Sequence, residues 1–158
     1  MSFMFENLEV YQRAVDLVQK IAALTQSFPA KGYHYLIDQL RRASLSIPLN
    51  IAEGNGRWHV GDRKNFFWIA RGSVSECVPL LELCKREKLI TEETWIELKS
   101  ELEVLSKMLT ALVKGTDKRA QQNNGSVDRI LCILHCSNVE CSNALNFSAS
   151  GGKIWWSQ

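Results

Sequence analysis

The sequence predicts an all-α protein: an up-and-down antiparallel four-helix bundle followed by a C-terminal tail. Apolar residues recur every three or four positions in four separate segments, which places them on one face of a helix in each segment. Short connections join the segments, so helices that follow one another in the chain are expected to lie antiparallel. The 158 residues, of which 46% are hydrophobic and 23% charged, are enough to bury a core between four such faces.

The first segment predicts a helix from residue 7 to residue 27. Asn7 is the expected N-cap, and Glu9 lies in the first turn, where the helix dipole favours a negative charge. Pro29 and Gly32 end the pattern. The apolar face consists of Val10, Ala14, Leu17, Ile21, Leu24 and Phe28.

The second segment predicts a bent helix that ends near Gly54. Pro48 lies inside it and has no N–H to donate to the carbonyl of Ser44, so a kink or the start of a new helix is expected there. Gly54 and Gly56 are interpreted as a helix stop and a turn. The apolar face consists of Leu36, Leu40, Ala43, Ile47 and Ile51.

The third segment predicts a helix that Asp62 caps and that Pro79 bends. Gly72 lies within it and costs about 1 kcal/mol relative to alanine, so we interpret Gly72 as a packing glycine that admits a close approach of another backbone. The apolar face consists of Phe67, Ala70, Val74, Cys77, Leu81 and Cys84. The two cysteines on this face are expected to be core residues.

The fourth segment predicts a helix that opens at Thr91, Glu92 and Glu93 and closes at Gly115. Its apolar face consists of Trp95, Leu98, Leu102, Leu105, Leu109 and Leu112. Residues 117–126 are polar and have no apolar periodicity, which predicts a linker. The bundle is therefore expected to occupy residues 1–116, and residues 117–158 to form a weakly structured tail.

Charge is distributed unevenly although the net charge is only +2. Residues 31–72 hold seven basic and three acidic residues, a net charge of +4, whereas residues 89–117 hold three basic and six acidic residues, a net charge of −3. The candidate nucleic-acid-binding residues come from the basic segment, where guanidinium groups could hold phosphates: Arg41, Arg42, Arg57, Arg63, Lys64 and Arg71.

Two interpretations of these basic residues stay open. They could form a phosphate-binding surface, or an ordinary solvated helix face with local ion pairs such as Asp38 with Arg42. Trp58 and His59 lie beside Arg57 and could stack on the bases of a single strand. Alternatively, the Trp58 side chain could pack on the end of the bundle.

Three stretches carry a resemblance to a known family. Residues 38–54 (DQLRRASLSIPLNIAEG), 7–14 (NLEVYQRA) and 69–73 (IARGS) resemble the bacterial four-helix-bundle family known from open reading frames in intervening sequences of the large-subunit ribosomal RNA gene. The resemblance covers about residues 5–115. Residues 76–83 (ECVPLLEL) look closer to a branch of the same fold, the accessory variability determinant of diversity-generating retroelements.

The retroelement branch implies a homopentamer that binds RNA or DNA through basic surface and associates with the reverse transcriptase of the element. A net charge of +2 per subunit would give +10 in a pentamer, which favours a polyanionic partner. The ribosomal RNA branch implies the fold and little about the biochemical role.

Catalytic and metal chemistry find no support in the residue pattern. The three histidines lack a neighbouring nucleophile with a third orienting group, and the Glu-x-x-His motif of di-iron bundles is absent. The possible zinc ligands have a spacing that matches no pair of zinc clips, so no cofactor or metal is expected: Cys132, His135, Cys136 and Cys141.

The expected function is that of a non-enzymatic, homo-oligomeric, nucleic-acid-binding accessory protein that assists a reverse transcriptase. The alternative is a protein-interaction scaffold that does not contact nucleic acid. The sequence has no secretory signal and no apolar stretch that could span a membrane, and its five cysteines fit reduced thiols, so the cytoplasm is the expected compartment.

Overall fold

The computed structural model describes the backbone of residues 3–136 and the side chains of residues 3–116 except Ala30. The part of the predicted tail beyond residue 136, which includes Cys141, lies outside these residues. The chain divides into two compact units, residues 1–120 and 121–158. The first unit contains the bundle and all of the side chains discussed below.

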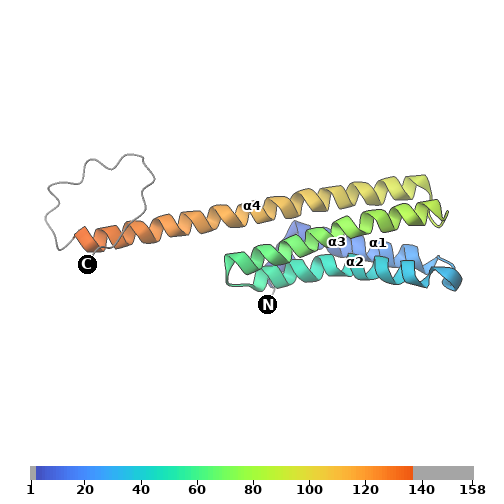
Figure 1. Cartoon of the computed structure of the whole chain (residues 1–158), viewed down its shortest axis with the longest axis horizontal. Coiled ribbons are helices and arrows are strands. Elements are labelled where there is room, and N and C mark those ends of the chain that lie inside the picture. Colours follow the sequence, from blue (N-terminus) through green and yellow to red (C-terminus); the bar gives the residue numbers. More distant parts are fainter. Residues whose placement is uncertain (1–2, 137–158) are drawn as a thin grey trace, which may run out of the picture. The chain divides into compact units, whose positions relative to one another are not determined.

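The described residues form one short 3₁₀-helix and four α-helices and contain no strand. Figure 1 shows α1, α2, α3 and the first part of α4 running alternately up and down the bundle, which confirms the predicted all-α four-helix bundle. The elements are η1 (Met4–Asn7), α1 (Glu9–Gln26), α2 (Ala30–Gly56), α3 (Val60–Arg86) and α4 (Glu92–Cys136).

The core lies where the four predicted apolar faces meet. All of the residues assigned to these faces are buried, except that Leu24, Trp95 and Leu112 are partly buried. At about 1.5–3 kcal/mol for each fully buried large aliphatic or aromatic side chain, these faces provide the main stabilisation of the fold. The period of the apolar pattern therefore positions the helices, and the outward-facing residues are available for function.

The prolines do not start new helices. The only non-helical backbone in α2 is at Lys31 and Gly32, where the φ of Gly32 is +97°, and the helix continues through Pro48 to Gly56. A proline costs a helix interior about 3 kcal/mol. Burial of Ile47 and Ile51 on either side of it offsets that cost, because each contributes about 1.5–3 kcal/mol. Helix α3 likewise continues through Pro79.

The predicted end of the fourth helix at Gly115 is wrong, because α4 continues to Cys136 and includes the predicted linker of residues 117–126. Gly32 is the only glycine with a positive φ in the described backbone, so Gly115 keeps a right-handed helical conformation. A glycine ends a helix when it adopts the left-handed conformation, and otherwise only weakens the helix by about 1 kcal/mol.

The two predicted N-caps, Asn7 and Asp62, are wrong by one and three residues. Asn7 belongs to η1, and Leu8 precedes α1, while His59 precedes α3 and Asp62 lies inside the first turn. The N–H of Arg63 already donates to the carbonyl of His59 at 3.0 Å, so helical bonding begins before Asp62. The fourth helix begins at Glu92, directly after Thr91, as predicted, and Thr91 caps it, because its Oγ1 accepts a hydrogen bond from the N–H of Thr94 at 3.3 Å.

A chain of hydrogen bonds joins α2 to α3. The amide Nδ2 of Asn50 donates to Ser46 Oγ at 3.0 Å, and Ser46 Oγ lies 2.9 Å from Ser73 Oγ. Because the hydroxyl of Ser73 donates to the carbonyl of Ile69 at 3.1 Å, Ser46 is the donor to Ser73. The chain therefore runs in one direction, from Asn50 to Ile69.

None of the helices in the described part of the chain combines the length and the apolar composition that crossing a bilayer requires.

Candidate nucleic-acid interface

The six predicted basic residues lie in three separate places. Arg41 and Arg42 are in the middle of α2, while Arg57, Arg63 and Lys64 flank the turn between α2 and α3, and Arg71 is on α3. Sixteen residues separate Arg41 from Arg57, which corresponds to about 24 Å along a helix. The six residues therefore do not form one continuous patch.

Arg41 connects two helices. Its Nε donates to the Oγ1 of Thr25 on α1 at 2.8 Å, and the buried Thr25 hydroxyl in turn donates to the carbonyl of Ile21 at 2.9 Å. Arg42 is exposed, and the ion pair considered for it with Asp38 is not formed. A change at Arg41 would thus alter packing between α1 and α2 as well as surface charge.

The turn between α2 and α3 brings Arg57 and Arg63 together. Arg57 forms an ion pair with Glu53, and its guanidinium carbon lies 4.8 Å from the centre of the Phe66 ring. Arg63 Nη2 donates to the carbonyl of Arg57 at 2.8 Å, just after the end of α2, which fixes the turn. Lys64 is half-buried on the first turn of α3. This cationic cluster is held by short-range contacts within the turn.

Trp58 is the most exposed large hydrophobic residue among the described side chains, with 90% of its surface accessible. It lies at the tip of the same turn, between Arg57 and the exposed His59. The alternative in which this aromatic packs on the end of the bundle is therefore wrong. An accessible indole beside several cations is an arrangement that suits base stacking.

Arg71 lies apart from the turn, in a groove between α3 and α4. Its guanidinium carbon is 5.2 Å from the centre of the Trp68 ring, and its Nε is shielded from solvent without a hydrogen-bond partner in the described structure. The groove has a volume of about 320 Å³. It is lined by Arg71, Ser106, Lys107, Thr110, Ala111 and Lys114.

Lys107 and Lys114 were missed by the sequence interpretation because they lie in the net-acidic segment. Their spacing is the signal that could have indicated them, since positions 107, 110, 111 and 114 share one face of a helix. No described acidic residue lines the groove. Glu97 and Glu101 form ion pairs with Lys20 of α1, and the hydrogen bond from Lys20 to Glu101 is the main cause that raises the pKa of Lys20.

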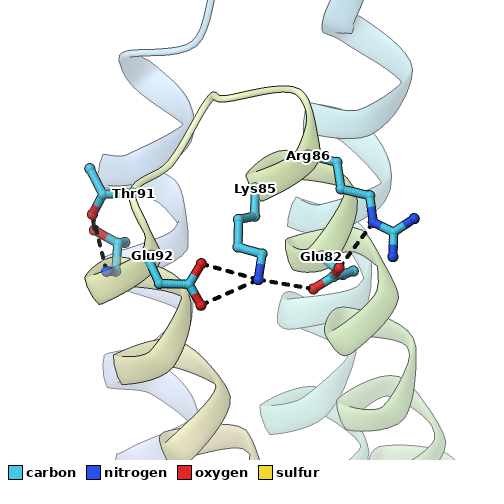
Figure 2. A network of polar contacts seen from close by, with 6 residues as sticks. Glu82, Lys85, Arg86, Thr91 and Glu92 are labelled. Atoms are coloured by element: carbon cyan, nitrogen blue, oxygen red, sulfur yellow. Dashed lines mark hydrogen bonds and ion pairs between the residues drawn. The ribbon is translucent and has the colours of Figure 1, made fainter.

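A polar network at the turn between α3 and α4 involves further carboxylates (Figure 2). Lys85 Nζ lies 3.2 Å from a carboxylate oxygen of Glu92 and 3.7 Å from Glu82, and Arg86 Nε donates to Glu82 at 3.0 Å. These cations lower the pKa of Glu82, with the hydrogen bond from Arg86 as the largest cause. Lys85 also lies 3.8 Å from the centre of the Trp95 ring. This turn is at the opposite end of the bundle from the turn between α2 and α3 (Figure 1).

The described side chains contain no group of three histidine, cysteine or acidic residues that could hold a metal ion. Cys77 and Cys84 are buried, which confirms their assignment to the core. Burial raises the pKa of Cys77 to about 12 and that of Cys84 to about 11, so neither thiol is available as a thiolate near neutral pH. Cys132, His135 and Cys136 belong to α4, but their side chains are outside the described set, as is Cys141.

Comparisons with known proteins identify relatives of the bundle. A family model for the 23S rRNA-intervening sequence protein matches residues 6–111. A solved structure of a protein of unknown function from the S23 ribosomal protein family of Bacteroides thetaiotaomicron is similar in fold, with a TM-score of 0.62 and 23% sequence identity over 66% of this chain and 98% of that chain. No curated protein matches the sequence.

Proposed function

This chain belongs to the family of 23S rRNA-intervening sequence proteins, and from that premise we propose that it is a non-enzymatic, homo-oligomeric protein that binds single-stranded nucleic acid. The observation that carries the proposal is the almost fully accessible indole of Trp58 at the tip of a turn that also holds Arg57, Arg63 and Lys64. Burying this indole against a base would remove apolar surface from water, while the cations neutralise the adjoining phosphates.

The arrangement favours a single strand over a duplex. Stacking on an indole requires an unpaired base with an accessible face, and each base–aromatic stack contributes about 1–3 kcal/mol. The ion pair between Arg57 and Glu53 is exposed and therefore weak, so Arg57 can exchange this partner for a phosphate at little cost. If about six phosphates are neutralised in the assembly, the logarithm of the affinity should fall with the logarithm of the salt concentration at a slope of roughly −4.

We expect Trp58→Ala to weaken binding of a fluorescein-labelled 12-nucleotide single-stranded RNA by about 5- to 150-fold, which corresponds to one lost stack of about 1–3 kcal/mol. Fluorescence anisotropy at two salt concentrations measures this change, together with the salt slope. Trp58→Phe should retain most of the affinity because it keeps an aromatic face.

Tyr35→Ala is the matched control, because Tyr35 is also an exposed aromatic but lies near the start of α2, far from the turn. It should bind like the unmodified chain. Equal affinities of Trp58→Ala and Tyr35→Ala, or no binding by the unmodified chain, would refute the proposal. The six basic candidates are less suited to this test, since changes at Arg41 and Arg63 also remove hydrogen bonds that support the fold.

Self-association is the second part of the proposal. Apolar side chains remain about half exposed on the outward faces of α2 and α3, including Leu45, Leu49 and Ile69. Apolar surface of this kind is typical of protein interfaces. The resemblance to the retroelement branch implies five subunits, so sedimentation equilibrium should give about 90 kDa, five times the 18.0 kDa of one chain. Leu49→Arg should shift this mass toward that of the monomer, whereas an unmodified chain of 18.0 kDa would exclude self-association.

The proposed partner is the reverse transcriptase of a diversity-generating retroelement, a proposal supported only by the resemblance of residues 76–83. A reverse transcriptase and a repeat pair beside the coding region, and co-purification with that enzyme, would support it. The same exposed apolar side chains on α2 and α3 favour one alternative function, a protein scaffold without nucleic-acid contact. The anisotropy experiment separates the two functions, because a scaffold would not bind the RNA at either salt concentration.

A further inference from the structure

We infer that the groove between α3 and α4 that Arg71, Lys107 and Lys114 line is a binding site for linked phosphate groups. For its biological ligand, a nucleic-acid backbone, the inference rests on the proposed function. Its chemistry does not depend on that function and can be tested with inorganic tripolyphosphate. The groove involves neither Trp58 nor the cationic cluster of the α2–α3 turn.

The charge of the groove is entirely positive. Three of its six lining residues are cations and none is acidic. Among the side chains that the structure describes, neither Lys107 nor Lys114 takes part in an ion pair, whereas Glu97 and Glu101 of the same helix are paired with Lys20. An anion in the groove would therefore meet three positive groups without first displacing a described carboxylate.

Arg71 supplies the directional contact. Its shielded Nε lacks an acceptor in the described structure, and a shielded donor without a partner destabilises the free protein. A guanidinium that turns from the Trp68 ring toward the groove can present two parallel N–H donors to one phosphate. The phosphate would then pair the donor that the free protein leaves without a partner.

The hydroxyl groups of the groove have different roles. The hydroxyl of Thr110 donates to the carbonyl of Ser106 at 2.8 Å, so its proton is already used. The hydroxyl of Ser106 has no hydrogen-bond partner in the described structure and is the neutral donor for a phosphate oxygen. Lys107 and Lys114 are seven residues apart, about 10 Å along α4, so a single phosphate contacts both only if the two lysine side chains converge on it. A chain of phosphates can use both.

Isothermal titration calorimetry of the full chain with tripolyphosphate tests the site. We expect Lys107→Gln with Lys114→Gln to weaken binding by about tenfold or more, since each substitution removes a charge-assisted contact that solvent partly screens. Arg71→Lys should also weaken binding, because lysine retains the charge but not the paired donors. Circular dichroism verifies that the variants fold.

The matched control is Lys88→Gln with Lys99→Gln, which removes the same two charges near the other end of the α3–α4 pair and should leave tripolyphosphate binding unchanged. An equal loss in the control would show that net charge alone matters and would overturn the inference, as would unchanged binding by the groove variant. If hexaglutamate binds as tightly as tripolyphosphate at the same ionic strength, the groove takes acidic polypeptides and the phosphate site is refuted.

The same variants distinguish failure of this inference from failure of the proposed function. Binding of tripolyphosphate that depends on the groove, without any binding of single-stranded RNA, supports the phosphate site and refutes the proposed function. Two results together would support the proposed function and overturn the phosphate site. RNA binding would depend on Trp58, and tripolyphosphate binding would be unchanged by Lys107→Gln with Lys114→Gln.

Discussion

Replacing Gly54 with alanine is expected to lower the free energy of unfolding by about 1–3 kcal/mol, although alanine is the better helix former. A Cβ atom at Gly54 would lie 2.7 Å from Phe67 Cε1 and 3.0 Å from Phe66 Cβ. Phe67 is 1% exposed, so its ring cannot move into solvent. The backbone of α2 and the ring on α3 must therefore separate, and urea denaturation measures the cost.

Gly72→Ala is the control and should have the opposite effect. A Cβ at Gly72 meets no atom within 4 Å, and Gly72 lies inside α3 without a positive φ. Alanine there should raise the free energy of unfolding by up to about 1 kcal/mol. Combining Gly54→Ala with Phe67→Leu should recover part of the loss, because the smaller side chain makes room. Equal stability of Gly54→Ala and Gly72→Ala would contradict the close approach at Gly54.

The surroundings of Gly54 and Gly72 also correct the sequence interpretation of these two glycines. Gly72 was expected to be the packing glycine and Gly54 a simple helix stop, and the distances reverse these roles. The sequence could not assign them, because an isolated glycine in a helical pattern does not reveal which neighbour faces it. That information comes from the position of Phe67 on another helix.

Raising the pH from 8 to 11 should reduce the free energy of unfolding by about 5 kcal/mol through the two buried thiols. Burial raises the pKa of Cys77 from 9.0 to about 12 and that of Cys84 from 9.0 to about 11. Below pH 9 both states of the protein hold protonated thiols, so these groups have no effect there. Above pH 9 the unfolded chain loses the protons while the folded chain retains them, so stability falls as the pH rises toward the folded pKa values.

Urea denaturation at pH 8, 9, 10 and 11 with a reducing agent measures this dependence, and Cys77→Ala with Cys84→Ala is the comparison. The substitutions should lower stability at pH 8 because they leave small cavities, but they should flatten the decline above pH 9. Lys20 and Tyr33, whose pKa values are also raised, contribute equally to both proteins and cancel in the difference. Parallel curves for the two proteins would show that the thiols ionise freely in the folded state.

The fold could be predicted because it depends on local periodicity. Residues such as Leu17, Leu40, Val74 and Leu102 occupy the core that their spacing indicates. The extent of α4 was underestimated because a helix can continue through a glycine such as Gly115 when nothing stabilises a left-handed turn. The polar composition of residues 117–126 does not by itself end α4.

The candidate sites were predictable only in part. Arg57, Arg63 and Trp58 are close in sequence and come together at one turn, so their proximity could be foreseen. The groove pairs Arg71 with Lys107, which lie 36 residues apart on helices of opposite net charge. A count of charges along the chain averages these lysines with carboxylates that contact Lys20 on another helix. Only the arrangement of the helices shows that the lysines of the groove and the carboxylates that contact Lys20 belong to different surfaces.

The hydrogen bonds that run from Asn50 through Ser46 and Ser73 to Ile69 set the register of α2 against α3. They add a directional constraint to the apolar contacts between the two helices, which include the close approach of Phe67 to Gly54. A slip by one turn, about 5.4 Å, would separate the hydroxyl of Ser46 from that of Ser73 and leave partly buried donors and acceptors unmatched. We therefore expect α2 and α3 to move as one rigid body. A nucleic acid bound at the turn that joins them, as the proposed function requires, would then displace both helices together.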